Sequence, residues 1–519
     1  MISTSLFKLR KYAVITTGLG LALIGISNSS AEETAFINTL PLYSPKIDSN
    51  PNGDKTNSDD DAILSTLTLP LYRFQGDEKT LYTGTLKLNK KALDSIEYHQ
   101  VPRTTQTEFD EGFPKDIARE LQDLMENTVK QDQVPGTIIL VDYYGKVWRG
   151  VAGKARIDDK PQVFLNKFRI GSITKMFVAS IVLALVQDPK NNLTLDDTMK
   201  KWFHDESWYS NLPNGDKITI RYLLRHQSGL YNYTASPEMV ASMYELPMRI
   251  FTPQELLAIS FSHGSEFEPG TKYSYSNTNY ILAGLLIEKI THHSVAENIN
   301  SRILEPTGMF NTAFPNDASI PYYYSHGYTY LGQNISPKDT TFYEPSVAWA
   351  AGAIISNSID LEHFTRLQAM GKISPSEELS KQLQEERFKF ANPSNLKTYQ
   401  GCNQKDSENE LLYGIGIFCY YGYLGHEGVF PGYNTSTYYR PDEENTDKGI
   451  GITINLNITD SPKVTARDIF LKIAGILHNK NSLLRKKSLS KSNGQLPDGR
   501  TVIQARLGTK ADEKVIAGF

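Results

Sequence analysis

The sequence predicts an α+β fold in which one antiparallel sheet is flanked by helices. Strand patterns lie near both ends of residues 113–479, and a long run of helical patterns separates them. An apolar-faced helix stands at each end of the same region. One sheet that combines both groups of strands, with helices packed on its faces, would bury the apolar side of every element.

The individual elements follow from the spacing of apolar residues. A first helix places Ile117, Leu121, Leu124, Met125 and Thr128 on one face. Two apolar stretches around Tyr144-Gly145, at residues 137–141 and 146–151, predict a hairpin. Helices are then expected at residues 172–187, 222–226, 278–291, 296–304 and 359–370. Strands are expected at residues 413–418, 433–440 and 449–455, and a closing helix at 463–477.

Composition and charge exclude several classes of function. The 519 residues carry 54 bases and 58 acids, and residues 32–479 alone hold 42 bases and 55 acids. A body this acidic is a poor partner for nucleic acid or an anionic membrane surface. With 39% hydrophobic residues the chain can build a sizeable core, and its two cysteines exclude a disulfide-dense scaffold and a four-cysteine zinc site.

Residues 1–31 are expected to be a signal peptide. Lys8, Arg10 and Lys11 precede a mostly apolar run, and Ser29-Ser30-Ala31 supplies small residues for cleavage. The apolar run, residues 12–26, is shorter than the roughly 20 residues that a spanning helix needs. Cleavage is therefore favoured over a membrane anchor, no stable membrane span is expected afterwards, and the mature protein would be periplasmic or secreted.

Residues 32–112 are expected to form an N-terminal extension without helical periodicity. The pentapeptide Thr-Leu-Pro-Leu-Tyr occurs at 39–43 and again at 68–72, and its proline predicts edge strands or extended segments. Between them, Asp48 to Asp59 approaches a calcium-loop pattern. Because Pro51 interrupts that loop and its last ligand is Asp where Glu is usual, an acidic linker is the favoured interpretation.

Residues 480–519 are expected to form a solvated, mobile, basic tail, with nine bases against three acids. Contact with an acidic partner is a weaker alternative. Export would permit a disulfide between Cys402 and Cys419, and the alternative is two buried thiols.

Ser172 and Lys175 form the clearest chemical signal. They stand three residues apart at the start of an apolar helix, and so on one face of it. Free N–H groups in the first turn favour negative charge near the Ser172 oxygen. Lys175 would lie one turn deeper, where burial lowers the pKa of a lysine and lets it act as a base. The alternative is an N-capping serine followed by a surface lysine.

Two further motifs follow in an order that is more specific than Ser-x-x-Lys alone. Tyr275-Ser276-Asn277 ends a loop just before the helix expected at 278. His426-Glu427-Gly428 leads through Pro431-Gly432 into a strand. No G-x-S-x-G and no H-E-x-x-H is present, so neither an alpha/beta-hydrolase nor a zinc peptidase is supported.

With these motifs the chain resembles the superfamily of serine beta-lactamases and penicillin-recognising D-alanyl-D-alanine carboxypeptidases. It is most similar to the branch of class C beta-lactamases, DD-carboxypeptidases, alkaline D-peptidases and related esterases. The resemblance covers about residues 115–478 and implies a beta-lactamase/transpeptidase-like fold with a helical insertion domain in residues 113–479. The matching stretches lie at residues 168–175, 223–230, 273–280, 350–356 and 425–428.

The resemblance also implies a role for each site residue. Ser172 would be acylated, and Lys175 and Tyr275 would act together as general base and proton shuttle. Asn277 would donate to the substrate or hold Lys175, and His426 would line the strand side of the site. The backbone N–H groups of Ser172 and Val429 would form the oxyanion hole, with Glu427 and Gly428 beside the substrate.

Two departures from the DD-carboxypeptidase pattern bear on specificity. Phe418 stands where an arginine helps to hold the terminal carboxylate of the substrate, and Glu427 stands where threonine is frequent. Both changes remove attraction for a free carboxylate, and Glu427 would repel one unless it is protonated or turned away. We therefore expect weak activity on acyl-D-Ala-D-Ala ends compared with amides or esters.

The leading hypothesis is an exported serine hydrolase that acts through an acyl-enzyme on D-amino-acid peptides, amides or peptidoglycan-type peptides. An esterase or a beta-lactamase of the same family is the first alternative, and a non-catalytic peptide- or glycan-binding protein on the same scaffold is the second. The partner would be a peptide or ester substrate, and neither metal nor organic cofactor is required. The oligomeric state is left open.

Overall fold

A computed structural model describes residues 12–17, 20–25, 63–75, 78–89, 106–158, 160–321, 323–330, 337–390, 412–442 and 448–491. The chain divides into two units, Met1–Arg103 and Thr104–Phe519. No helix in these ranges is long and apolar enough to cross a membrane.

The first unit contains two antiparallel strand pairs. β1 (Tyr12–Thr17) pairs with β2 (Gly20–Gly25), and β3 (Ile63–Gln75) pairs with β4 (Glu78–Asn89). The second pentapeptide lies in β3, where Pro70 stands opposite Thr83. Both strands of a two-stranded pair are edges, so the missing N–H of a proline is tolerated there. The other pentapeptide and the calcium-like loop at 48–59 lie outside the described residues, and signal cleavage stays a prediction.

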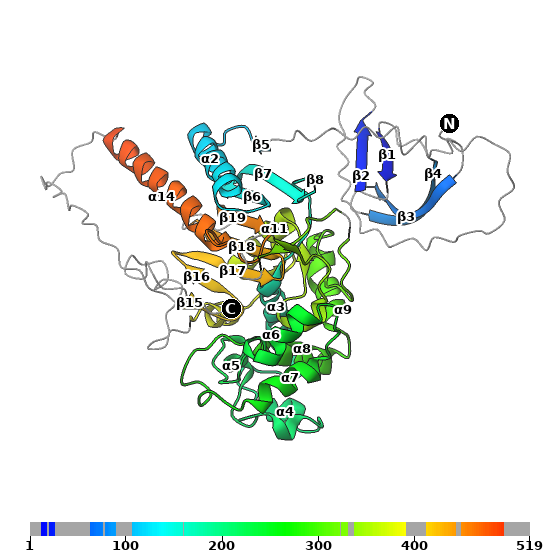
Figure 1. Cartoon of the computed structure of the whole chain (residues 1–519), viewed down its shortest axis with the longest axis vertical. Coiled ribbons are helices and arrows are strands. Elements are labelled where there is room, and N and C mark those ends of the chain that lie inside the picture. Colours follow the sequence, from blue (N-terminus) through cyan, green and yellow to red (C-terminus); the bar gives the residue numbers. More distant parts are fainter. Residues whose placement is uncertain are drawn as a thin grey trace, which may run out of the picture. The chain divides into compact units, whose positions relative to one another are not determined.

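An antiparallel sheet forms the centre of the second unit (Figure 1). Its strand order is β15-β16-β17-β18-β19-β6-β7-β5, and β8 pairs with β7. The predicted combination of strands from both ends is confirmed, because β19 pairs with β18 on one side and with β6 on the other. The bounds are β5 (Gln106–Phe109), β6 (Gly136–Tyr143), β7 (Lys146–Arg156), β8 (Lys160–Pro161), β15 (Leu412–Tyr413), β16 (Phe418–Tyr420), β17 (Tyr423–Phe430), β18 (Tyr433–Pro441) and β19 (Gly449–Leu456).

Helices cover both faces of this sheet, as the α+β prediction requires. α2 (Lys115–Gln131) and α14 (Ala466–Lys491) lie together on one face (Figure 1). α11 (Ser358–Ala369) packs on the strands of the other face, towards the helical insertion. The insertion contains α3 (Thr174–Gln187), α4 (Met199–Phe203), α5 (Ile220–Leu224), α6 (Pro237–Glu245), α7 (Pro253–Ser262), α8 (Thr278–Thr291) and α9 (Val295–Ile299).

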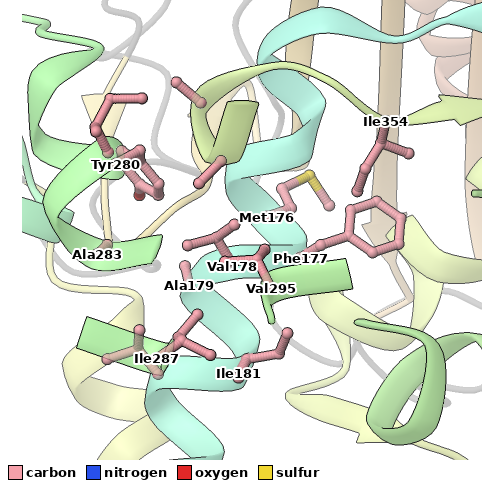
Figure 2. Packing of buried hydrophobic residues seen from close by; sticks show 14 of the residues in the cluster. Met176, Phe177, Val178, Ala179, Ile181, Tyr280, Ala283, Ile287, Val295 and Ile354 are labelled. Carbon is pink, nitrogen blue, oxygen red and sulfur yellow. The ribbon is translucent and has the colours of Figure 1, made fainter. Parts of the chain in front are cut away.

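α3 is the most deeply buried helix of the insertion. Every residue from Thr174 to Leu185 is buried, which explains why its sequence is apolar all round. Figure 2 shows its side chains packed among Tyr280, Ala283 and Ile287 of α8. On another side the ring of Phe177 stacks on Phe364 of α11, with centroids 3.8 Å apart. The packing holds the helix rigidly between the insertion and the sheet.

Several predicted boundaries differ from the structure. The helix expected at 172–187 begins with a 3₁₀ turn, η2 (Gly171–Ile173). The strand expected at 413–418 is two short strands, because Gly416 adopts a left-handed φ of 66° and packs against Ala179. α4, α6 and α7 were not expected. α14 continues past 479 to Lys491, where no glycine or proline interrupts it, and β5 lies within residues assigned to the extension.

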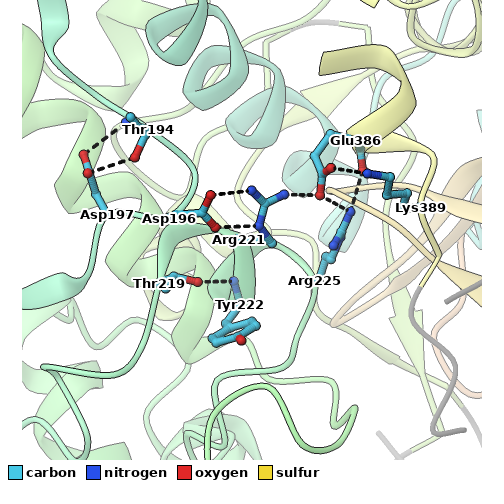
Figure 3. Close-up of polar contacts among 9 residues, drawn as sticks. All are labelled: Thr194, Asp196, Asp197, Thr219, Arg221, Tyr222, Arg225, Glu386 and Lys389. Atoms are coloured by element: carbon cyan, nitrogen blue, oxygen red, sulfur yellow. Dashed lines mark hydrogen bonds and ion pairs between the residues drawn. The ribbon is translucent and has the colours of Figure 1, made fainter. Parts of the chain in front are cut away.

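An ion-pair network joins α5 to α12 (Lys381–Arg387) beside the insertion (Figure 3). The Glu386 carboxylate accepts from Arg221, from Arg225 at 2.6 Å and from Lys389 at 2.8 Å. Arg225 is 2% exposed, so Glu386 provides the charge that compensates a buried guanidinium. Arg221 also reaches Asp196 at 2.9 Å, but the Asp196 side chain is 73% exposed.

Removal of the Glu386 carboxylate and removal of the Asp196 carboxylate should lower the free energy of unfolding by different amounts. Glu386→Ala leaves Arg225 buried without a counter-charge and is expected to lower the free energy of unfolding by about 3 kcal/mol. Asp196→Ala, the matched control, removes an exposed pair and is expected to cost less than about 1 kcal/mol. Urea unfolding of both variants measures the difference, and equal costs would contradict this account.

Candidate active site

The turn that carries the predicted nucleophile, η2 (Gly171–Ile173), lies where the insertion meets the sheet; it is called the nucleophile turn below. Ser172 is in η2, and its neighbour Gly171 has a left-handed φ of 51°. A side chain at Gly171 would overlap the backbone of Val429 in β17. Glycine at this position therefore lets the start of the Ser-x-x-Lys helix approach the strand that carries His426, Glu427 and Gly428.

Lys175 is fully buried, and its amine makes three contacts. Nζ lies 2.8 Å from Ser172 Oγ, 2.7 Å from Asn277 Oδ1 and 2.7 Å from the carbonyl oxygen of Ala351. Burial holds the pKa of Lys175 well below its usual value of 10.5, and the described residues place no carboxylate in an ion pair with it. A neutral amine has two N–H donors and one lone pair. In that form the amine would donate to the amide and carbonyl oxygens, which would leave its lone pair for the hydroxyl of Ser172.

Tyr275 lies on the other side of Ser172. Burial raises the pKa of its phenol well above 10, and a hydrogen bond with Ser172 opposes part of that rise. The Lys175 Nζ lies 5.0 Å from the centre of its ring. The pKa shifts of the two groups are opposite in direction, and each favours the uncharged form of its group beside the same hydroxyl.

Asn277 is held from both sides. Its Oδ1 accepts from Lys175, and its Nδ2 donates to Thr234 Oγ1 at 3.0 Å. Its backbone N–H donates to Asn232 Oδ1 at 3.0 Å. The structure thus places Asn277 at Lys175, and the contact with Thr234 sets the orientation of its amide.

His426 is a buried, neutral imidazole. Burial is the main cause that lowers its pKa to about 3. Nδ1 lies 2.5 Å from the Glu427 carbonyl oxygen and must donate to it, so Nε2 accepts from the Tyr413 hydroxyl at 3.2 Å. His426 consequently contributes no positive charge to the strand side of the site.

Glu427 points to the face of β17 opposite His426, which is the turned-away case that the sequence left open. Its carboxylate accepts from Arg467 Nε and Nη2, each at 2.5 Å, and from the Tyr438 hydroxyl at 3.0 Å. Side chains alternate between faces along a strand. Arg467 lies in the first turn of α14, where the sequence offered no signal of this contact.

Gly428 and Val429 place strand β17 against the nucleophile. A Cβ at residue 428 would overlap the carbonyl oxygen of Ile170 and lie 3.1 Å from the backbone nitrogen of Ser172. The absence of a side chain lets the two backbones meet. The N–H groups assigned to the oxyanion hole, those of Ser172 and Val429, therefore belong to segments in direct contact.

A group of aromatic and imidazole rings behind Tyr275 was missed from the sequence. The ring of His226 lies 4.1 Å from that of Tyr275, and its Nδ1 accepts from Ser276 N at 3.2 Å and Asn279 Nδ2 at 3.1 Å. Tyr280 and Tyr413 pack beside it. His226 thus holds the backbone and the ring of Tyr275 together. In the sequence, His226 stood out by its place in the matching stretch 223–230, which did not indicate this role.

The predicted disulfide can be followed at only one of its two cysteines. Cys419 is buried in β16 and is not a free thiol, while Cys402 lies outside the described residues, so their pairing stays a prediction. In the part of the chain that the structure describes, no cluster of three or more His, Cys, Asp or Glu is arranged to hold a metal.

The fold and the site define a class: α+β proteins with a Ser-x-x-Lys nucleophile at the junction between a sheet and a helical insertion. A family model described as Beta-lactamase matches residues 121–475. The chain belongs to the beta-lactamase family, within the superfamily that also contains penicillin-binding proteins. The resemblance stated from the sequence and the predicted fold class are both confirmed.

Curated relatives are similar in sequence to part of this chain. Protein flp of Staphylococcus aureus (strain MRSA252) is 26% identical over 257 residues, 49% of this chain and 49% of that protein. Penicillin-binding protein 4* of Bacillus subtilis is 27% identical over 218 residues, 41% of this chain and 46% of that protein. The matches thus span about half the length of these relatives.

Solved structures match over more of the domain. The D-stereospecific amidohydrolase from Streptomyces sp. is 29% identical with a TM-score of 0.56, over 67% of this chain and 96% of that one. The D-amino acid amidase from Ochrobactrum anthropi SV3, complexed with L-phenylalanine amide, is 25% identical with a TM-score of 0.57, over 70% and 99%.

The opposite pKa shifts of Lys175 and Tyr275 predict a pH profile. Acylation needs the neutral amine, so kcat/KM for a p-nitrophenyl ester should fall as pH drops through the lowered pKa of Lys175. The rate should stay level near pH 10, because Tyr275 keeps its proton there. Lys175→Arg, which stays protonated, should lose at least about 100-fold in rate. A rate that still climbs near pH 10 in the wild type would contradict a depressed lysine pKa.

The contact between β17 and the nucleophile turn predicts that one added methyl group at residue 428 will slow acylation. Gly428→Ala should push the strand away from Ile170 and reduce acylation by about 100-fold, the scale for losing one oxyanion donor. Gly475→Ala is the control, because a Cβ there meets nothing within 4 Å. Stopped-flow acylation with circular dichroism checks rate and folding, and equal rates in the two variants would refute the role of Gly428.

Proposed function

We propose that this protein is an exported serine hydrolase that forms an acyl-enzyme on Ser172. Its substrates would be amides or peptides of D-amino acids, or peptidoglycan-type peptides. The observation that carries the proposal is the 2.8 Å contact between the Ser172 hydroxyl and the buried amine of Lys175, whose pKa burial lowers well below 10.5. A structural lysine would not be kept fully buried without a carboxylate beside a partly exposed serine.

The first half of the reaction follows from this geometry. Ser172 Oγ attacks the substrate carbonyl while its proton passes to the lone pair of Lys175. The carbonyl oxygen gains the negative charge, which the N–H groups of Ser172 and Val429 stabilise. As the carbon–nitrogen or carbon–oxygen bond breaks, Tyr275 gives its proton to the leaving group and recovers one from Lys175. Each proton taken from Ser172 is thus returned to the leaving group.

In the second half, water attacks the acyl-enzyme along the same route. Tyr275 and Lys175 accept its proton, the oxyanion hole again holds the negative charge, and Ser172 Oγ leaves with a proton. The chemistry requires only side chains and backbone groups of this chain. A binding protein without catalysis, the alternative from another class, would gain nothing from a depressed lysine pKa at the serine.

The likeness to two amide hydrolases supports the substrate class. A D-stereospecific amidohydrolase and a D-amino acid amidase match this domain along almost their whole length. The penicillin-binding protein relative supports peptidoglycan-type peptides as the related choice. Esters and beta-lactams remain the other acyl donors to include in a test, as family members act on both.

Intact-mass spectrometry tests the proposal directly. Incubation with a fluorophosphonate, and with a panel of D-amino-acid amides, D-peptides, esters and penicillin, should add one adduct or acyl mass to the wild type. Ser172→Ala should gain none, whereas Ser262→Ala, at an exposed serine of α7, should react like the wild type. No adduct from any reagent would favour the non-catalytic binder.

A further inference from the structure

Arg387, the last residue of α12, is a fully buried cation. It is 0% exposed, and burial lowers its pKa only to about 10, so the guanidinium keeps its charge at neutral pH. Nη1 donates to Gln368 Oε1 at 2.6 Å, which is an uncharged acceptor. Nε and Nη2 are buried without a hydrogen-bond partner among the described residues. These two nitrogens form one edge of the planar group, so a fork of N–H donors stays unused inside the protein.

The positive charge of Arg387 is not compensated by a carboxylate in the described part of the chain. The carboxylate of the preceding residue, Glu386, is bound by Arg221, Arg225 and Lys389 instead (Figure 3). The buried Arg225 therefore has a counter-charge, whereas the buried Arg387 has none. An ionised group in a protein interior is costly unless an opposite charge lies beside it. The side chains described here thus leave one buried positive charge without its partner.

A second buried arginine shows how this chain holds a guanidinium that has no direct ion pair. Arg169 is also 0% exposed, and it donates to the carbonyl oxygens of Ala318 at 2.6 Å and Thr341 at 3.3 Å. Its guanidinium also lies 5.1 Å from the centre of the Phe430 ring, which adds a favourable cation–π contact. Arg387 has only one neutral oxygen in place of these groups, so its partner is still missing.

The surroundings of Arg387 limit the size of the missing partner. Gln368 of α11, which accepts from Arg387, also accepts from Ser180 of α3. The backbone carbonyl of Arg387 accepts from Ile415 N at 3.0 Å. All four of these residues are 0% exposed, so the guanidinium lies beneath the surface where α3, α11 and α12 meet. A substrate or a peptide is too large for such a position, and a small ion is the occupant that suits it.

We propose that one small monovalent anion of the size of chloride binds beside the Nε and Nη2 edge of Arg387. The anion accepts both unused N–H groups and supplies the negative charge that the chain lacks there. Because Ser180 lies in the same helix as Lys175, the occupied site fastens α11 and α12 to the helix that carries the proposed catalytic base. Binding to the folded state alone stabilises it, whatever reaction the protein catalyses.

Thermal unfolding in chloride tests the inference. Chloride replaces gluconate, an anion too large for the site, at constant ionic strength. The Tm of the wild type should rise by about 3 °C and then level off, because a ligand that binds only the folded state saturates its site. Arg387→Met keeps the length of the side chain without its charge and should show no such rise. Arg249→Met, at an arginine whose side chain is 45% exposed, should respond like the wild type.

Diffraction from wild-type crystals grown in bromide gives a second measurement that needs no variant. An anomalous peak in contact with Nε and Nη2 of Arg387 is the expected result. Bromide bound only at the molecular surface overturns the inference, and so does an equal chloride response of the wild type and Arg387→Met. If Arg387→Met does not fold, the bromide peak decides alone. Neither measurement depends on acylation of Ser172, so failure of the proposed function would be seen separately.

Discussion

The lowered pKa of Lys175 depends on an environment in which the described residues offer its amine oxygen acceptors but no carboxylate partner. The amide oxygen of Asn277 and the carbonyl oxygen of Ala351 accept from this amine, and neither oxygen can donate in return. Of its three contacts only the serine hydroxyl has a proton to give, so this arrangement also aims the lone pair of a neutral amine at Ser172. Burying this amine costs folding free energy at neutral pH, because the unfolded chain would hold a proton there. The apolar packing around α3 offsets that cost.

That environment requires three segments distant in the chain to meet within one hydrogen-bond length of each other. η2 and the start of α3 bring Ser172 and Lys175, the loop before α8 brings Tyr275 and Asn277, and the turn before Gly352 brings the carbonyl of Ala351. β17 then closes the site, and it approaches only because Gly171 and Gly428 carry no side chains. A sheet built from both ends of the domain is what places β17 there, since β19 joins the late strands to the early hairpin.

Much of this fold could be predicted from the sequence, because its signals are local. Apolar spacing predicted α2, α3, α8, α11 and the hairpin of β6 and β7, and motif order predicted which side chains would converge. Features decided by tertiary contact were missed. The 3₁₀ turn at Ser172 follows from docking on Val429, and the break between β15 and β16 follows from packing Gly416 on Ala179. The ring of His226 under Tyr275 had no periodic signal at all.

The ion pair of Glu427 is the clearest case of a contact that could not be predicted from the sequence around the residue. From the sequence this residue was an acid at the mouth of the site, and repulsion was the natural consequence. Its partner lies forty residues later, on a helix whose face towards the sheet could be predicted but whose contacts with single residues could not. An ion pair has almost no net charge, and both oxygens of this carboxylate are already occupied by one guanidinium. The formal charge of Glu427 in the sequence is therefore a poor guide to the electrostatics of this strand.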